Sequence, residues 1–208
     1  MTAAGTWLAP VSVAAVVAVV ELDAVQVGQV MISRPVVLGP LLGLLCGQPQ
    51  NGIILGLVCE LFSQDDLPVG GRLPLNATIA VSAAFLLSWG SRAVPPEAAL
   101  PAGLATGWLH QHLEARLRLR RRALSGCAET GILRGAMPPL GRMITKALAE
   151  QAAGNLAIML GVVFLIGPTL HWLWPYAPRS VAEGLRFAWD AAPWLGLAVL
   201  LHTLRAAP

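Results

Sequence analysis

The sequence predicts an all-α, polytopic integral membrane protein with about six hydrophobic segments, one of which is a re-entrant hairpin. Of its 208 residues, 56% are hydrophobic and 12% are charged, whereas soluble domains carry about 25% charged residues. The seven tryptophans lie near the ends of the apolar segments, where indole rings anchor a protein at the membrane interface. Four runs without a charged side chain approach or exceed the ~20 residues that cross a bilayer as a helix: residues 1–20, 35–59, 73–91 and 151–178.

The first predicted segment covers about residues 8–27 and is rich in alanine and valine. It carries two acids close to its end, Glu21 and Asp23. Because a carboxylate at membrane depth is costly unless it faces water or a protein partner, we expect one of these surroundings for both acids.

The second apolar stretch, residues 35–62, is broken by the polar sequence Gly47-Gln-Pro-Gln-Asn-Gly52. Neither arm, 36–46 or 53–62, is long enough to cross about 30 Å of hydrocarbon alone. We therefore predict a re-entrant hairpin, whose tip must be buried in protein or line a cavity, and such broken segments mark transport sites. Glycines recur every four residues in each arm and predict close backbone packing: Gly39, Gly43 and Gly47, then Gly52 and Gly56.

The remaining segments follow from the apolar runs and from the proline and glycine positions. Pro101 is expected to bend the fourth segment, and the amphipathic helix after it is expected to lie on the membrane surface. In chain order we expect a third segment at 75–89, a fourth at 97–113, the amphipathic helix at 110–124, a loop at 126–141, a short helix at 144–151, and segments at 152–174 and 187–204.

Basic residues are concentrated in one part of the chain, since eight of the fourteen lie between Arg116 and Lys146. Beside a membrane segment the positive-inside rule explains such a cluster, so we place it in the cytoplasm and expect no nucleic-acid binding. Three regions result: 1–113, a membrane region with the hairpin and the candidate binding site; 114–151, a basic amphipathic cytoplasmic segment; and 152–208, the C-terminal membrane helices.

Glu60 is the first candidate for a binding residue, because it ends the apolar second arm of the hairpin. An isolated ionised carboxylate there would cost several kcal/mol. It could reach water at the rim or pair with Arg34 or Arg72. Alternatively, it could accept hydrogen bonds from the hydroxyls of a polar, uncharged solute. The sequence leaves both alternatives open.

Other polar side chains near the hairpin are also ambiguous. Asp66, beside Asp65, is either solvated or part of the site. Asn76 begins the next segment and can be an N-cap or a ligand contact. Gln48, with Gln50 and Asn51 at the hairpin tip, could face the same cavity or only satisfy the backbone of the turn.

Metal binding and catalysis are not expected. His110, His112 and Glu114 are spaced i, i+2 and i+4, so only the outer two share a helix face, and a surface position is favoured. The sequence contains no G-x-S-x-G, no H-E-x-x-H and no phosphate-binding P-loop motif. We therefore expect no enzyme activity, no catalytic residues and no metal or cofactor.

Residues 22–90 resemble the N-terminal half of the membrane-embedded IIC subunits of the mannose/sorbose family of the bacterial sugar phosphotransferase system. In order and spacing, the family pattern is an Arg-Pro, a glycine-bearing arm, a Gly-Asp tip, a glycine-rich second arm ending in Glu-Leu, a Pro-x-Gly loop and a Pro-Pro-Asp-like start of the next segment. Here the corresponding residues are Arg34-Pro35, Gly43, Gly47-Gln48, Gly52, Gly56, Glu60-Leu61, Pro68-Val-Gly70 and Pro74-Leu-Asn76.

The resemblance implies a multi-pass protein of the cell inner membrane that imports a hexose-type sugar together with a IID membrane subunit, in an oligomeric complex. Phosphate would come from phosphoenolpyruvate through IIA and IIB phosphocarrier subunits, so this chain would not carry it. The implied sugar-binding residues are Glu60 and Asn76 first, then Gln48, Asp66 and Asp23.

The chain also departs from the family pattern, because amides at Gln48 and Asn76 stand where the family has acids. The competing hypothesis is therefore a shortened structural or regulatory membrane subunit of such a complex, without sugar binding of its own.

Overall fold

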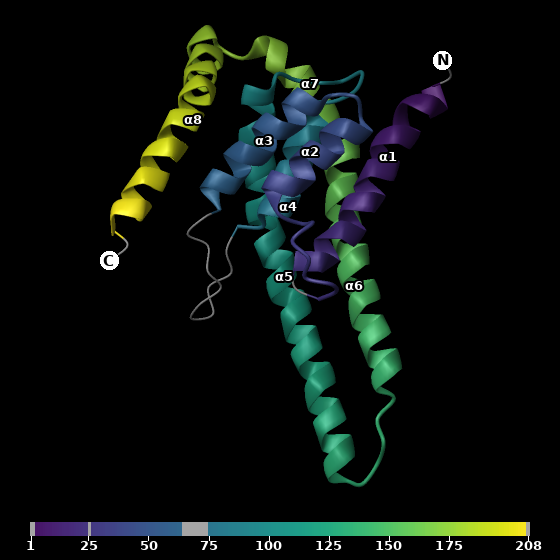
Figure 1. The fold of residues 1–208 in the computed structure, drawn as a ribbon. Helices are drawn as coiled ribbons and strands as arrows, with labels where there is room; N and C mark the ends of the chain where they lie inside the picture. The colour runs from purple at the N-terminus through teal and green to yellow at the C-terminus, as the bar shows by residue number, and fades with distance from the viewer. Residues whose placement is uncertain (1–2, 25, 64–74, 207–208) are drawn as a thin grey trace.

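The computed structural model describes residues 3–24, 26–63 and 75–206, and within these ranges every regular element is a helix (Figure 1), as the sequence predicts. The elements are α1 (Ala3–Val20), the 3-10 turn η1 (Glu21–Ala24), α2 (Pro35–Leu45), α3 (Pro49–Phe62), α4 (Ala77–Leu87), α5 (Pro96–Leu133), α6 (Leu140–Gly161), the π-helical turn η2 (Val162–Ile166), α7 (Gly167–Leu173), the 3-10 turn η3 (Trp174–Tyr176) and α8 (Arg179–Ala206).

Two stretches of the described chain are helical, long and apolar enough to cross a membrane, Trp7–Ala24 and Leu140–Tyr176. The helices α2, α3 and α4 are also apolar but shorter, at 11, 14 and 11 residues. The predicted number of about six membrane segments therefore stays a prediction, because hydropathy and length identify only two spans among the described residues.

The helices α2 and α3 form the predicted hairpin, and their glycines are the points of contact. A Cβ atom added at Gly43 would lie 2.8 Å from the Gln48 carbonyl oxygen, and one added at Gly56 would lie 2.5 Å from the Pro35 carbonyl oxygen. At Gly39 and Gly52 an added Cβ would overlap the carbonyl oxygen of the other glycine. The arms thus pack backbone against backbone, as the four-residue spacing predicts.

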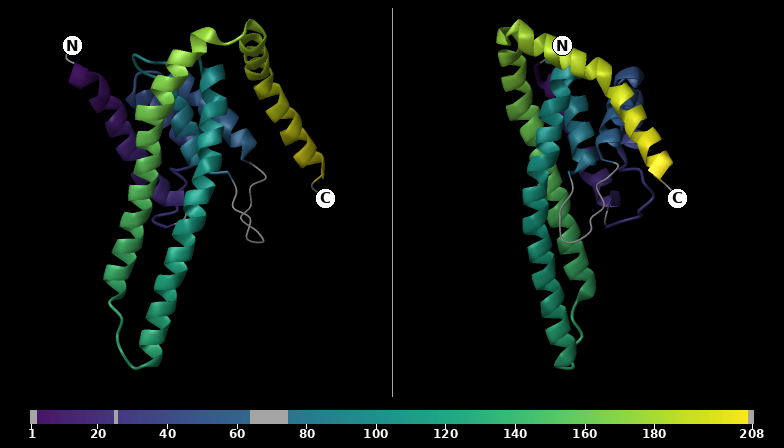
Figure 2. Two further views of the ribbon diagram at one scale, coloured as in Figure 1. Left: turned by 180° about the vertical axis from the view of Figure 1, so that it is seen from behind. Right: turned by 90° about the vertical axis from the view of Figure 1, so that its left-hand side faces the viewer.

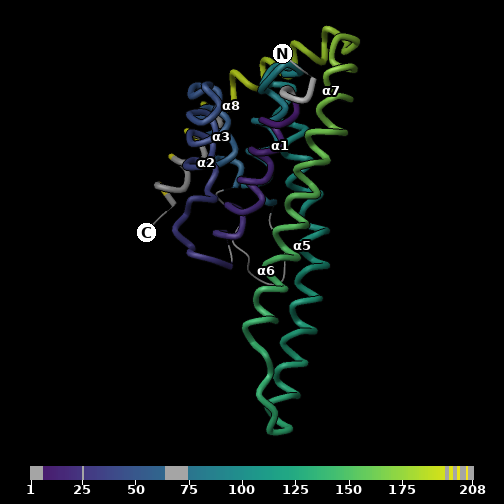
Figure 3. The backbone as a smooth tube through the Cα atoms, turned by 90° about the vertical axis from the view of Figure 1, so that its right-hand side faces the viewer, coloured from purple at the N-terminus to yellow at the C-terminus, as the bar shows by residue number. Residues whose placement is uncertain are grey.

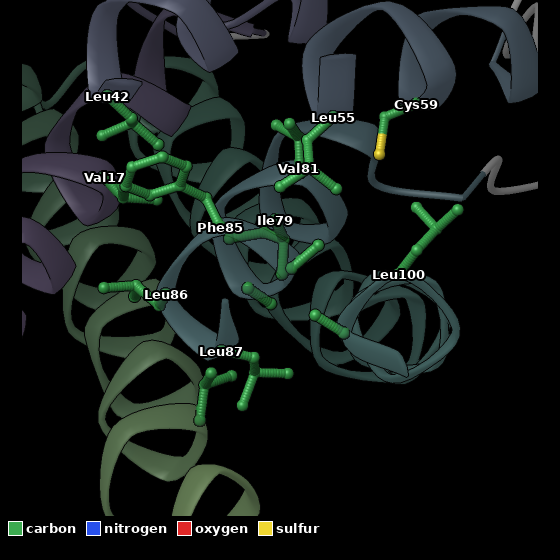
Figure 4. Packing of buried hydrophobic residues seen from close by; sticks show 14 of the residues in the cluster. Val17, Leu42, Leu55, Cys59, Ile79, Val81, Phe85, Leu86, Leu87 and Leu100 are labelled. Atoms are coloured by element: carbon green, nitrogen blue, oxygen red, sulfur yellow. The ribbon is translucent and has the colours of Figure 1, made fainter. Parts of the chain in front are cut away.

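The short helix α4 lies at the centre of the core, and all its residues from Thr78 to Leu87 are buried. A helix that is apolar on every side is expected to be enclosed by other elements. Figure 4 shows the Phe85 ring close to Val17 of α1 and Leu42 of α2. Helix α5 covers another side closely, since a Cβ at Gly103 would lie 2.6 Å from the Ala80 carbonyl oxygen.

The segment after residue 113 differs from the sequence prediction. The amphipathic stretch does not leave the helix axis to lie on the membrane surface, and the loop does not begin at Gly126, because α5 continues unbroken past Pro101 to Leu133. Leu113 and Leu117 of this stretch instead pack on α6, where a Cβ at Gly154 would lie 3.0 Å from Leu113 and 3.4 Å from Leu117. Helix α6 thus covers the apolar stripe of α5 at Leu113 and Leu117.

The connected ends of α5 and α6 extend well beyond the other helices (Figures 1 and 2). The N-terminus and α7 lie at the opposite end of the molecule (Figure 1). The last helix, α8, contacts α3 and α5, and it is longer than the predicted segment at 187–204.

Candidate functional site

Glu60 lies at the open end of the hairpin and forms an ion pair. Its Oε1 accepts a hydrogen bond from Arg34 Nη1 at 3.1 Å, and its Oε2 accepts one from the Val36 backbone N–H at 3.3 Å. The Glu60 side chain is 20% exposed. The pairing with Arg34, one of the two alternatives drawn from the sequence, is therefore present, and the carboxylate remains accessible from outside the protein.

Asp23 organises the loop that leads into the hairpin. Its Oδ1 accepts a hydrogen bond from the Val30 N–H at 2.8 Å, and its Oδ2 accepts bonds from the Ser33 N–H and hydroxyl, both at 3.4 Å. The Ser33 carbonyl in turn accepts a hydrogen bond from the Thr78 hydroxyl at 2.8 Å. These contacts connect η1, the residue before Arg34 and the first turn of α4.

Asn76 is the N-cap of α4, because its Oδ1 accepts a hydrogen bond from the Ile79 N–H at 2.9 Å. The other end of the same amide points into the protein. Its Nδ2 donates to Glu21 Oε1 at 2.8 Å and lies 3.2 Å from His110 Nδ1. The capping role considered from the sequence is thus confirmed, and the amide nitrogen joins a buried network as well.

This buried network consists of Glu21, Asn76, His110, Gln151 and Asn155, and it connects α4, α5 and α6 to η1. Asn155 donates through Nδ2 to Glu21 Oε2 and accepts at Oδ1 from Gln151 Nε2 at 3.3 Å. His110 Nε2 lies 2.9 Å from the same Oδ1. The side chains of His110 and Asn155 are fully buried, and 6% of Glu21 is exposed.

The donors and acceptors fit together in one arrangement. Asn76 Nδ2 carries two hydrogens, which serve Glu21 and His110 Nδ1, so the ring proton lies on Nε2 and is donated to Asn155. An aspartate at position 76 would offer no donor to either neighbour. The amide that replaces the family's acid therefore matches the buried carboxylate of Glu21.

The network continues to the point where α5 and α6 leave the core. Gln151 Nε2 donates to Glu114 Oε2 at 3.0 Å, and Glu114 Oε1 accepts from Arg118 at 2.9 Å and Arg121 at 2.6 Å. Burial raises the pKa of Glu114, but hydrogen bonds from Arg118, Gln151 and Arg121 and the Arg121 charge outweigh it, so this pKa lies below its ordinary value. The carboxylate is thereby held in its charged form.

His110 corrects the sequence analysis, which placed it on the surface. The i, i+4 spacing of His110 and Glu114 does put them on one face of α5, but that face is turned toward α6. Gln151 and Asn155, also spaced i, i+4, face it from α6. Gln151 and Asn155 could have been found from the sequence, because they are two amides on one face of an otherwise apolar span. The described residues contain no cluster of three or more potential metal ligands.

The structure brings three of the five predicted site residues to one end of the hairpin and α4: Asp23, Glu60 and Asn76. Gln48 lies at the other end, at the exposed hairpin tip, where its Oε1 accepts from Asn51 at 3.4 Å. Eleven residues of α3 lie between it and Glu60, which places the two about 18 Å apart along the helix at 1.5 Å per residue. Asp66 lies outside the described residues.

A separate cavity of about 220 Å³ lies between α1, the end of α4 and η2. It is mainly apolar, and the Arg92 guanidinium stacks on the Trp7 ring 4.3 Å from its centroid. None of the described predicted site residues lines it. This cavity is thus distinct from the hairpin mouth, by which we mean the surroundings of Asp23, Arg34, Glu60 and Asn76.

Comparison with solved structures shows that the fold is that of known membrane proteins. A chain described as a membrane protein aligns with a TM-score of 0.71 at 17% identity, covering 100% of this chain and 82% of that one. A chain of the mannose transporter ManYZ, solved by cryo-EM in complex with microcin E492, aligns with a TM-score of 0.60 at 19% identity, covering 99% and 82%.

At the sequence level, a provisionally named N-acetylgalactosamine permease IIC component 2 of Escherichia coli (strain K12) is 41% identical over 69 residues. That match covers 32% of this chain and half the length of the relative. A family model described as the sorbose-specific IIC component of the phosphotransferase system matches residues 7–207. Because the match extends over nearly the whole sequence, the chain belongs to the family of sorbose-specific IIC components of the sugar phosphotransferase system.

Proposed function

We propose that this protein is the sugar-translocating IIC subunit of a phosphoenolpyruvate-dependent phosphotransferase system of the mannose/sorbose type. It binds a hexose-type sugar and imports it across the inner membrane together with a IID subunit, while IIA and IIB subunits carry the phosphate. Family membership supports this role, as does a fold shared with a chain of the mannose transporter ManYZ. Phosphorylation on the inner face gives the sugar a charge, so it cannot return through hydrocarbon.

The main observation in support of the proposal is that polar side chains lie together at the hairpin mouth. Glu60 accepts two hydrogen bonds there, from Arg34 and from the Val36 backbone, whereas a carboxylate offers about four lone-pair positions. The ion pair therefore orients Glu60 without saturating it. The remaining lone-pair positions of Glu60 can accept hydroxyl groups of a neutral sugar. Asp23 and the Oδ1 atom of Asn76, which accepts one hydrogen bond from the Ile79 N–H, lie on the neighbouring elements.

The hairpin geometry suits a moving element of a transporter. Its two arms contact each other through glycine backbone atoms, so they form one rigid unit. At its mouth, the Thr78 hydroxyl of α4 donates a hydrogen bond to the carbonyl of Ser33, in the loop just before α2, and so connects this unit to α4. We propose that the hairpin shifts as one body against the other helices and carries Glu60 with it.

Glu60→Gln is expected to lower sugar uptake about tenfold or more while leaving membrane abundance unchanged. The substitution preserves shape but removes a charged acceptor, and a hydrogen bond to a charged group contributes about 1.5–3 kcal/mol. Uptake of labelled hexoses by cells that carry the complete transport system measures the effect.

Glu183→Gln is the matched control, because Glu183 is an exposed acid on α8 and should transport like the parent. Unchanged uptake in Glu60→Gln would remove Glu60 from the site. An equal loss of uptake and of membrane abundance would mean that Glu60 contributes to folding and not to sugar binding.

The alternative, a structural or regulatory subunit without sugar binding, is favoured by two observations. Neither Gln48 nor Asn76 supplies a carboxylate, and Arg34 already neutralises Glu60. Equilibrium binding of labelled hexoses to the purified complex separates the two functions. The transport function requires saturable binding that weakens in Glu60→Gln, and the structural function predicts no binding in either protein.

A further inference from the structure

The connected ends of α5 and α6 form an arm that no other part of the described chain covers. We call residues 118–150 the α5–α6 arm. Buried side chains flank it at Leu117 and Gln151, but none of its own residues is buried. The α5 part contains 16 residues, which corresponds to about 24 Å of helix. Figure 3 shows both helices continuing straight past the core.

The arm concentrates positive charge. It has seven basic and two acidic residues, a net charge of +5, whereas the whole chain carries +3. Arg118 and Arg121 are held by Glu114 at the base of the arm. The others are exposed and form no ion pair with any described residue: Arg120, Arg122, Arg134, Arg142 and Lys146.

The tip of the arm is apolar and exposed. Leu133 is 81% exposed and Met137 is 98% exposed, and Ile132, Leu140 and Ile144 beside them are also mainly exposed. These side chains lie around one turn, with Arg134 and Arg142 among them. An apolar centre bordered by arginines is the composition of a protein-binding surface, and contiguous exposed apolar side chains indicate a partner.

The length of the arm favours a soluble partner over the bilayer. The uncharged run that can lie in hydrocarbon begins at Gln151, and the eleven residues of α6 before it extend about 16 Å further along the same axis. The headgroup layer on one side is only about 5–8 Å thick, and lipid charge acts within about 8 Å. The tip therefore reaches past the layer where anionic lipids would hold it.

We propose that the α5–α6 arm is the docking element for a water-soluble protein with an acidic, partly apolar face. This inference rests on the proposed function, in which such a protein must reach the inner side of the membrane to phosphorylate the arriving sugar. The arm's base is fixed by Glu114, Arg118, Arg121 and Gln151, so the docked partner takes a defined position relative to the hairpin mouth.

The test measures binding of the purified IIB-type phosphocarrier of the same system to the complete membrane complex in phosphatidylcholine nanodiscs. Arg134→Glu with Arg142→Glu should weaken binding at least tenfold, because two attractive charges become repulsive, and added salt should reduce the difference. Met137→Ser should weaken binding at any salt concentration, since it removes apolar contact. The control Arg179→Glu with Arg186→Glu reverses two exposed charges on α8 and should bind like the parent.

Equal binding by the parent and the arm variants would overturn the inference. So would parent binding that requires phosphatidylglycerol in the nanodisc, because the arm would then act on the membrane surface. Sugar binding, measured on the same samples, distinguishes the docking proposal from the proposed transport function. Saturable sugar binding in parent and arm variants supports the proposed function whatever the docking result, whereas its absence in the parent would contradict that function.

Discussion

Asn155→Ala is expected to lower the free energy of unfolding in detergent by about 3–5 kcal/mol, because it removes a partner from a buried carboxylate and from three further polar groups. Asn155 donates to Glu21 and to the Ala18 carbonyl, and it accepts from His110 and Gln151. The measurement is equilibrium unfolding of the purified chain in mixed micelles, followed by helical circular dichroism.

Gln50→Ala provides the control for this substitution. It also removes a side-chain amide from a helix, but Gln50 is exposed in the first turn of α3, so its loss should change stability by less than about 0.5 kcal/mol. Equal stability of Asn155→Ala and Gln50→Ala would mean that the buried network does not hold α1, α5 and α6 together.

Gly52→Ala should destabilise the hairpin by about 1–3 kcal/mol and abolish most sugar uptake. The added methyl group would overlap the Gly39 carbonyl oxygen, and such overpacking forces the backbones apart. Thermal unfolding in detergent and the uptake assay measure the two effects.

Gly161→Ala is the matched control, since Gly161 is also helical but an added Cβ meets nothing within 4 Å. Both substitutions gain up to about 1 kcal/mol of helix propensity, so any difference between them reports the backbone contact. If Gly52→Ala proved as stable and active as Gly161→Ala, this result would contradict the close backbone contact between α2 and α3.

Local patterns made the hairpin predictable. The Gly/Pro break at residues 47–52, two arms too short to cross a bilayer and glycines every four residues are all contained within 28 residues. The structure has α2, α3 and their glycine contacts as expected. The N-cap role of Asn76 could be predicted for the same reason, because a cap depends on the residues that follow it directly.

The buried network could not be predicted in this way, because it depends on pairs far apart in the sequence. Glu21 and Asn155 are separated by 134 positions and His110 and Asn155 by 45. An amphipathic pattern such as residues 110–124 suits a membrane surface and a partner helix equally well. Only the position of α6 shows that His110 faces the interior and that α5 continues straight.

We propose that this chain works as the membrane subunit of a sugar-transporting complex. The most direct test is to tag the chain in its native cell, extract it in mild detergent and identify the copurifying proteins by mass spectrometry. We expect recovery of one IID-type membrane protein together with a IIB-type phosphocarrier. Recovery of neither would contradict it.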